Sequence, residues 1–258
     1  MRNFSFLLIL MTLVSCHKPS ANTLRIGTIS GPETELVQVA QTVAQERYGL
    51  TIKIVEFNDY NLPNEALNEG SLDANIYQHL PYLNAAIEGH GYALKPIAKT
   101  FLYPMGLYSE KYKSMKAIPN HAIIALPNDP SNEARALLLL QQAHIITLNQ
   151  QKLPNINNIK KNPHQFKFKP LDAAQLPRVL ADVDAAIINT TFALPAGLKP
   201  SEDALLLENK DSPYANLIVV KKDDDKQEQL ARFVQAFQSE PVLQKAKALF
   251  GQEALKAW

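Results

Sequence analysis

The chain has 258 residues, of which 46% are apolar and 20% charged, the ordinary composition of a soluble globular protein with one large domain or two small ones. Its 26 Lys and Arg residues nearly balance its 25 Asp and Glu residues, so the formal net charge is +1. This balance excludes the basic excess that binding to a nucleic-acid backbone requires, and we expect no nucleic-acid partner.

The N-terminus is typical of a bacterial lipoprotein signal peptide. After a single basic residue, the apolar run over 4–14 is too short to span a bilayer but has the length of a signal-peptide core. The run ends in Leu13-Val14-Ser15-Cys16, which resembles the lipobox at which a lipoprotein signal peptidase cleaves. We therefore expect residues 1–15 to be removed, Cys16 to carry lipid, and residues 16–23 to form a lipidated tether. The alternative is an ordinary signal peptide whose cysteine is incidental.

Cys16 is the only cysteine of the chain, so no intramolecular disulfide can form, and lipidation explains why a secreted protein carries a lone cysteine. Several acyl chains make a stable membrane anchor, because each buried methylene contributes about 0.8 kcal/mol. His17, rather than the acidic residue of the usual inner-membrane retention signal, follows Cys16. The sequence thus predicts a lipid-anchored protein of the cell envelope, on the periplasmic face of a bacterial membrane.

The first structural unit after the tether is a strand, a helix and a second strand. Alternating apolar and polar residues predict strands over 23–29 and 51–57. Between them, apolar residues at helical spacing predict a helix over 33–48, with Pro32 suited to its start and Gly49 to its end. These elements, within about 35 residues, form a βαβ unit, which implies a parallel sheet.

The same patterns predict a second α/β cycle in the rest of the chain. Up to residue 108 we expect a short helix over 64–69, a strand over 73–77, a helix over 81–88 and an extended stretch over 93–108 that Pro104 interrupts. Beyond it we expect strands over 122–126, 166–171, 183–188 and 216–220, helices over 131–143 and 173–180, a surface loop over 149–162 and two helices between 223 and 250. Two such cycles predict two lobes with a cleft, in which ligands bind beyond the carboxyl ends of the strands.

Aromatic side chains gather at two of these strand ends. Tyr60 follows the strand over 51–57, whereas Tyr77, His79 and Tyr82 end or follow the strand over 73–77. Together they predict one aromatic wall for a flexible apolar side chain, and sulfur–aromatic contacts contribute about 0.3–1.5 kcal/mol each. The alternative is that these rings only fill the core beside the sheet.

Polar residues of the second cycle are suited to an anionic ligand. Arg135 lies near the start of the predicted helix over 131–143, where free N–H groups and the helix dipole favour an anion. A guanidinium can bind a carboxylate through two parallel hydrogen bonds. Asn189 and Asn216, at the ends of two predicted strands, can supply further hydrogen bonds. The alternatives are an exposed surface arginine and asparagines that serve only in turns.

The sequence carries no signature of an enzyme or of a metal site. The G-x-S-x-G, HExxH and glycine-rich phosphate-binding motifs are missing, and the six histidines are scattered. The acidic run Asp223-Asp224-Asp225 is more typical of a helix N-terminus than of a metal cluster. We therefore expect no catalytic residue, no metal and no cofactor. An enzyme that uses His79 as a general base is the alternative.

Ordered sequence segments run through the mature chain and end at Trp258. They are FNDY (57–60), LPNEAL (62–67), QH (78–79), PYL (81–83), PNDP (127–130), Arg135, LLLL (137–140), QLPR (175–178), INTT (188–191), SPY (212–214) and NLIV (216–219). Together these segments resemble the NlpA family of lipoproteins, the methionine-binding proteins of ABC importers. So many ordered matches over essentially the whole mature chain make the resemblance very specific.

The resemblance implies a periplasmic-binding-protein fold, with two α/β lobes, a ligand cleft and two crossing segments. We expect the crossings near 101–108 and 211–216. One lobe is then expected to comprise 24–102 and 213–258, and the other 103–212. The resemblance also implies that the protein captures methionine, L-methionine above all, and delivers it to an ABC permease driven by a separate ATPase subunit.

The resemblance also implies roles for individual side chains and leaves some questions open. Tyr77 stands where relatives often carry phenylalanine, and a hydroxyl buried without a partner is costly. Either it has a hydrogen bond or the ligand is more polar than methionine. No partner for the ligand ammonium is assigned, and D-methionine, a small methionine peptide, another amino acid, a metal or an adhesive surface role are the alternatives. By motif, Tyr60, Tyr77, His79 and Tyr82 resemble the side-chain pocket, Arg135 with Asn132 the carboxylate clamp, and Asn189 and Asn216 the remaining polar contacts.

Overall fold

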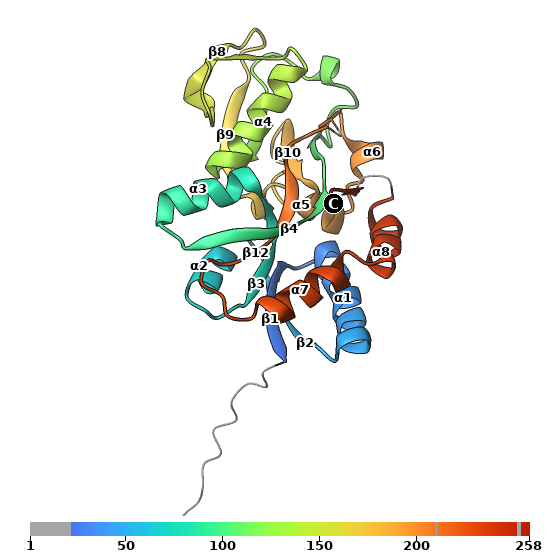
Figure 1. The fold of residues 1–258 in the computed structure, drawn as a ribbon. Helices are drawn as coiled ribbons and strands as arrows, with labels where there is room; N and C mark the ends of the chain where they lie inside the picture. The colour runs from blue at the N-terminus through green and yellow to red at the C-terminus, as the bar shows by residue number, and fades with distance from the viewer. Residues whose placement is uncertain (1–21, 210, 252–253) are drawn as a thin grey trace, which may run out of the picture.

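The computed structural model describes residues 22–209, 211–251 and 254–258, which form two lobes, each built around a β-sheet (Figure 1). The predicted signal peptide, the predicted lipidation site Cys16 and most of the predicted tether lie outside the described residues. In the described part of the chain, no helix is both long and apolar enough to cross a membrane.

The first sheet has six strands in the order β13-β4-β12-β3-β1-β2. They are β1 (Thr23–Ile29), β2 (Thr51–Phe57), β3 (Ala74–His79), β4 (Leu94–Leu102), β12 (Ala215–Lys221) and β13 (Leu255–Lys256). β1 pairs in parallel with β2 and β3, whereas β12 pairs antiparallel with β3 and β4. The predicted βαβ unit at the start of the chain is therefore confirmed.

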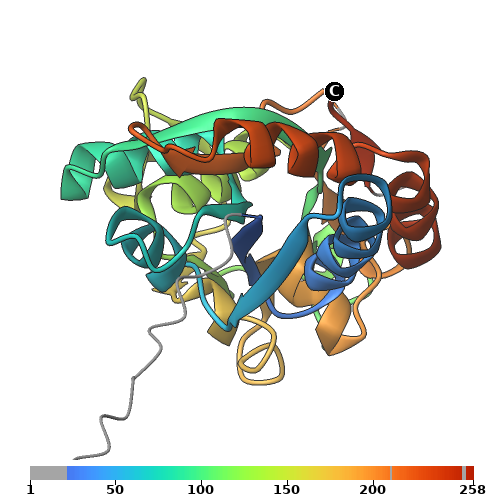
Figure 2. The same cartoon turned by 60° about the horizontal axis from the view of Figure 1, so that its bottom comes forward.

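Helices cover both faces of the first sheet, because successive residues of a strand point to opposite sides. The helices are α1 (Pro32–Tyr48), α2 (Leu62–Asn68), α3 (Leu80–His90), α7 (Gln227–Phe237) and α8 (Glu240–Phe250). Ile218 and Val220 of β12 face a core formed with α1, α7 and α8, whereas Leu217 and Val219 face a smaller core formed with α2 and α3. Figures 1 and 2 show α1, α7 and α8 packed side by side.

The ends of α1 follow from its local sequence, as predicted. Pro32 begins the helix after Gly31, whose φ of 129° favours glycine. At the other end Gly49 is left-handed, with φ of 59°, and the N–H of Leu50 donates to the carbonyl oxygen of Ala44. The N-terminus of α1 thereby lies just beyond the carboxyl end of β1, where ligands of α/β sheets bind.

The second sheet has five strands in the order β11-β5-β10-β6-β9. They are β5 (Met105–Tyr108), β6 (Ile123–Pro127), β9 (Lys167–Leu171), β10 (Ala185–Asn189) and β11 (Leu206–Leu207). Ile187 of β10 faces the core under α4 (Pro130–Gln142), whereas Ala186 and Ile188 face a second core near α5 (Thr190–Ala193). Short elements complete this lobe: η1 (Met115–Ala117), η4 (Leu194–Ala196) and α6 (Pro200–Asp203).

The chain passes twice between the two sheets. It leaves β4 of the first sheet, crosses at Tyr103 and Pro104, and enters β5 of the second sheet. It returns between β11 and β12, so the C-terminal helices rejoin the first lobe, as the colours of Figure 1 show. The predicted α/β fold of two lobes and two crossings is therefore confirmed, whereas the exact limits of each lobe remain a prediction.

The predicted helix over 173–180 is wrong. The chain makes one 3-10 turn, η3 (Ala173–Gln175), which Asp172 caps by accepting a hydrogen bond from the N–H of Ala174, and then continues in turns. Pro177 has no N–H with which to continue a helical ladder. The N–H of Arg178 accordingly reaches back only three residues, to the carbonyl oxygen of Gln175.

The predicted surface loop over 149–162 contains regular structure. After η2 (Ile156–Asn158), β8 (Ile159–Lys161) pairs antiparallel with β7 (Thr147–Leu148) in a small separate sheet. The asparagines that suggested a loop instead cap the short turn, because the N–H of Asn155 donates to Oδ1 of Asn158 over 2.9 Å. The sequence also does not predict the short elements between residues 190 and 207.

Candidate ligand-binding site

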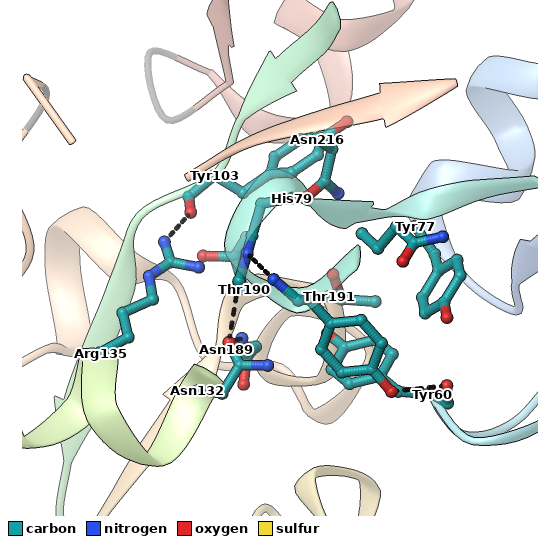
Figure 3. Close-up of a pocket in the computed structure, with 12 residues that line it drawn as sticks. Tyr60, Tyr77, His79, Tyr103, Asn132, Arg135, Asn189, Thr190, Thr191 and Asn216 are labelled. Atoms are coloured by element: carbon teal, nitrogen blue, oxygen red, sulfur yellow. Dashed lines mark hydrogen bonds between the residues drawn. The ribbon is translucent and has the colours of Figure 1, made fainter. Parts of the chain in front are cut away.

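A cavity lies between the two lobes, next to the ends of β3 and β10 (Figure 3). Residues of both lobes line it, and they include all eight residues that the sequence predicted to bind a ligand: Tyr60, Tyr77, His79, Tyr82, Asn132, Arg135, Asn189 and Asn216. Gln78, Tyr103, Thr190 and Thr191, to which the sequence assigned no role, line the cavity as well. The structure thus brings the predicted residues together, and their roles toward a ligand remain predictions.

The predicted aromatic wall is continuous. The ring centroids of Tyr60 and Tyr77 lie 5.7 Å apart, as do those of Tyr77 and Tyr82. The hydroxyl of Tyr82 donates to the carbonyl oxygen of Tyr60 over 2.8 Å, which fixes the two segments relative to each other. Phe192 of α5, in the second lobe, adds a ring 4.8 Å from Tyr60. No sequence pattern singles out Phe192, because only the approach of the lobes places its ring next to Tyr60.

A buried amide network holds the strand behind this wall. Gln78 of β3 accepts a hydrogen bond from Nδ2 of Asn64 over 2.9 Å and donates to Oδ1 of Asn75 over 2.9 Å. Asn75 in turn donates to Oδ1 of Asn64 over 2.9 Å. These bonds connect α2 with β3, so Gln78 supports the position of its neighbours Tyr77 and His79 in the strand.

A hydrogen-bond chain connects the two lobes through His79. Nε2 of His79 lies 3.3 Å from Oδ1 of Asn132, and Nδ1 accepts from the N–H of Tyr82 over 3.2 Å. This pairing assigns the proton of the ring to Nε2. Asn132 also accepts from Nδ2 of Asn189 and donates Nδ2 to Asp129, the residue that caps α4. The Asn132 side chain is therefore held in one orientation at the cavity wall.

The His79 side chain is neutral in this site. Burial, followed by the nearby positive charge of Arg135, lowers the pKa of His79 to about 3. A general base must accept a proton near the working pH, and both ring nitrogens of His79 already serve in structural hydrogen bonds. The geometry therefore argues against the alternative in which His79 is a catalytic base.

Arg135 is buried rather than solvated, with 4% of its side chain exposed, and lies in the second turn of α4. Its Nε donates to Oε1 of Glu208 over 2.9 Å, and its Nη2 donates to Oε2 of Glu208 and to the carbonyl oxygen of Tyr103. The ring of Tyr214 covers the guanidinium at 4.4 Å. The remaining amino group is turned toward the cavity (Figure 3). Glu208 therefore orients the cation and leaves one edge for an anionic ligand.

In the first lobe, Glu33 places a buried carboxyl group next to Asn216 of the cavity wall. Its Oε1 accepts a hydrogen bond from Nδ2 of Asn216 over 3.0 Å. Its side chain is buried in the first turn of α1, and burial raises its pKa to about 7, although the bond from Asn216 lowers it. The sequence did not single out Glu33, because an acidic residue in the first turn of a helix is common.

Three comparisons place these observations among known proteins. The family model of the NlpA lipoproteins matches residues 24–258. The chain belongs to the NlpA lipoprotein family. It is 46% identical to the D-methionine-binding lipoprotein MetQ of Salmonella typhi, with 96% of this chain and 94% of the relative covered.

Solved structures agree with this assignment to the NlpA family. An ABC transporter periplasmic substrate-binding protein from Coxiella burnetii is 53% identical, covers 91% of this chain and all of its own, and has a TM-score of 0.88. A nutrient-binding protein from Burkholderia cenocepacia bound to methionine is 46% identical, has the same coverage and has a TM-score of 0.89. All three relatives of the NlpA-family chain are described as binding proteins, and the one from Coxiella burnetii as the substrate-binding protein of an ABC transporter.

The buried ion pair generates a prediction about stability. Replacing Arg135 by Met leaves Glu208 charged and unpaired, so we expect the free energy of unfolding to fall by about 3–5 kcal/mol. Adding Glu208→Gln removes the stranded charge and is expected to restore most of the loss. Chemical denaturation of the wild type, the single variant and the double variant measures both effects. Equal stability of the single and double variants would contradict the pairing.

The Tyr77 hydroxyl generates a second prediction. It is buried and makes no well-aligned hydrogen bond among the described residues, having only the Tyr82 hydroxyl near it, whereas the Tyr82 hydroxyl donates to the carbonyl oxygen of Tyr60. Tyr77→Phe should therefore raise the free energy of unfolding by about 1 kcal/mol, and the matched variant Tyr82→Phe should lower it by about 1 kcal/mol. Denaturant unfolding of the ligand-free variants tests the pair, and a loss of stability in Tyr77→Phe would show that its hydroxyl has a partner.

Proposed function

We propose that this NlpA-family chain is the substrate-binding lipoprotein of an ABC importer and captures methionine, L-methionine above all, in the cavity between its lobes. The observation that carries the proposal is the cavity itself, which joins an aromatic wall to a buried guanidinium. That pairing suits an amino acid with a flexible apolar side chain. It is supported by the 46% identical relative from Burkholderia cenocepacia, which is described as bound to methionine.

The proposed roles follow from the chemistry of each wall. Tyr60, Tyr77 and Tyr82 contact the thioether chain, because sulfur and methyl groups pack well against aromatic rings. The free edge of Arg135 binds the carboxylate, supported by the buried amides of Asn132 and Asn189. Oδ1 of Asn189 is buried without a hydrogen-bond partner among the described residues and, as an acceptor, suits an N–H group of the ligand rather than its carboxylate. His79 and Asn216 complete the polar part of the cavity.

The protein works as a clamp that the ligand closes. The ligand-binding walls come from both lobes, so a ligand makes all of its contacts only when the lobes are together. It shifts the population toward the closed form by the difference in its affinity for the two states. The bond between His79 and Asn132 adds a contact between the lobes in that form. The two lobes of this clamp comprise 24–102 with 213–258, and 103–212, a division that the membership of the two sheets supports.

The closed clamp delivers its ligand at the membrane. Lipid on Cys16 anchors the protein to the periplasmic face of the bacterial envelope, the closed form docks on an ABC permease, and a separate ATPase subunit drives transport. Family membership and the description of the Coxiella burnetii relative as an ABC transporter component support these partners. The Salmonella typhi relative is named for D-methionine, so ligand stereochemistry needs a direct test.

The proposal is tested by calorimetry on the chain from residue 21 onward, unfolded and refolded to remove co-purified ligand. We expect one-to-one binding of L-methionine with a Kd in the micromolar range or tighter, about −8 kcal/mol or more favourable. D-methionine, Gly-Met and other amino acids are titrated for comparison. Absence of heat with every methionine compound, from protein shown to be folded, would refute methionine as the ligand.

The same titration tests the proposed carboxylate contact. The double variant with Arg135→Met and Glu208→Gln keeps the fold but lacks the cation, so its affinity for L-methionine should fall by about 2–4 kcal/mol. The variant Glu208→Gln alone serves as the control, because it keeps the guanidinium. Binding by the double variant with the Kd of the control would exclude Arg135 as the carboxylate partner.

A further inference from the structure

Glu33 lies next to the cavity wall, and the ammonium group of the proposed amino-acid ligand has no charged partner among the residues discussed so far. Its Oε1 is bonded to Asn216, a residue of the cavity wall, whereas its Oε2 is buried and has no hydrogen-bond partner among the described residues. Only 3% of Glu33 is exposed, so solvent does not satisfy this oxygen. A buried carboxyl oxygen without a donor costs stability, which a passing ligand with N–H groups can offset.

The two buried charges belong to different lobes. Glu33 lies at the start of α1 in the first lobe, and Arg135 lies in α4 of the second. The Tyr60 side chain, in the aromatic wall, lies within the electrostatic reach of both charges. Arg135 is neutralised by Glu208, whereas the Glu33 carboxyl has, among the described residues, only the neutral amide of Asn216 as a hydrogen-bonded partner. One cationic group thus lies in the cavity wall and one acidic group lies next to Asn216 of that wall, an arrangement that matches an α-amino acid zwitterion.

We propose that Glu33 supplies the negative charge that balances the ammonium group of the bound amino acid, at the end of the cavity where Asn216 lies. This inference rests on the proposed amino-acid ligand. It assigns a charged partner to the ligand's ammonium group, which the other residues leave without one. Asn216, which lies in the cavity wall and bonds Oε1 of Glu33, is the positioning residue that holds this carboxyl group beside the cavity. The ammonium then completes the hydrogen bonding of Glu33 and closes the clamp on both charges.

The surroundings of Glu33 explain why the ligand-free site is costly. Asn216 of β12 bonds it, and Tyr60 and Tyr103 are the titratable side chains whose pKa its charge raises. Both tyrosines stay protonated, because burial raises the pKa of each above its usual range. Glu33, with a pKa raised to about 7, is thus the group of this cluster that changes charge near neutral pH. Ligand ammonium favours its charged form, so binding near pH 7 releases a proton.

The stability of the ligand-free protein depends on pH with a defined sign. Because the pKa of Glu33 is raised from 4.5 to about 7 in the folded state, its contribution favours folding below pH 4.5 and is lost as the pH rises through about 7. The neutral isostere Glu33→Gln should therefore unfold at a higher temperature than the wild type at pH 8 and at the same temperature at pH 4.5. This readout also shows that the variant folds.

The decisive experiment titrates wild type, Glu33→Gln and Glu35→Gln at pH 8 with L-methionine and with 4-(methylsulfanyl)butanoate, which lacks only the amino group. We expect Glu33→Gln to weaken methionine binding about tenfold or more and to change binding of the deaminated compound less than about threefold. Glu35→Gln is the matched control, because Glu35 lies in the same helix turn and pairs with Lys245 of α8. It should bind both compounds like the wild type.

A second measurement uses methionine alone, so it remains informative if the deaminated compound binds too weakly to be titrated. Methionine is titrated at pH 7 in phosphate and in Tris, whose ionisation enthalpies differ. Wild type and Glu35→Gln should release protons on binding, and Glu33→Gln should release none. Unchanged methionine affinity in Glu33→Gln, equal losses for both compounds, or unchanged proton release would each overturn the role of Glu33. A wild type that binds no methionine compound would instead overturn the proposed function, and this inference with it.

Discussion

The buried pair of Arg135 and Glu208 joins α4 to both segments that connect the two lobes. Arg135 belongs to α4, Glu208 begins the second crossing, and the guanidinium also binds the carbonyl oxygen of Tyr103 in the first crossing. Oε2 of Glu208 in turn accepts the N–H of Met105 at the start of β5. One ion pair thus ties both connections between the lobes to the helix that faces the ligand. Its partners are over seventy residues apart in sequence, so only the folded chain can form it.

The charge balance around the cavity follows from this pair. A free arginine in a buried site would be very costly, and Glu208 offsets that cost while leaving one edge of the guanidinium unused. Glu33 has no such charged partner, and Asn189 has a buried oxygen without a hydrogen bond among the described residues. Some of the buried polar groups without a hydrogen-bond partner among the described residues therefore lie in the cavity wall or next to it. A ligand that carries charges and hydrogen-bond donors can pair with these buried groups, and its binding then offsets the stability that they cost.

Besides the charged groups, the aromatic wall determines which ligand side chains the cavity suits. Its rings come from the loop before α2, from β3, from α3 and, through Phe192, from the second lobe. An unbranched chain with sulfur can adapt to the space between such rings, whereas a bulky branched chain cannot do so easily. The family membership of the chain and the chemistry of its cavity therefore point to the same class of ligand through independent observations.

Much of the fold and of the site could be predicted from local sequence. The alternation in β1 and β2, the helical spacing in α1 and the left-handed Gly49 depend on neighbours in the chain, so their interpretation needs no distant partner. The ordered family segments likewise contain six of the eight predicted residues that line the cavity, and the other two, Tyr77 and Asn132, lie within two residues of such a segment. The predicted helix over 173–180 does not form, because Pro177 cannot donate a helical hydrogen bond. The apolar residues of this segment nevertheless recur at helical spacing.

Tertiary structure alone decided the electrostatics of the site. No local pattern distinguishes Glu208 or Glu33 from the other acidic residues of the chain, because their roles depend on burial and on partners from other elements. The same holds for Phe192, which meets Tyr60 only when the lobes approach. The sequence by itself therefore determined which family this chain belongs to and which side chains line the cavity. Only the folded structure decided which of them are charged, paired or left free, because charge and pairing depend on distances between segments that the chain order does not contain.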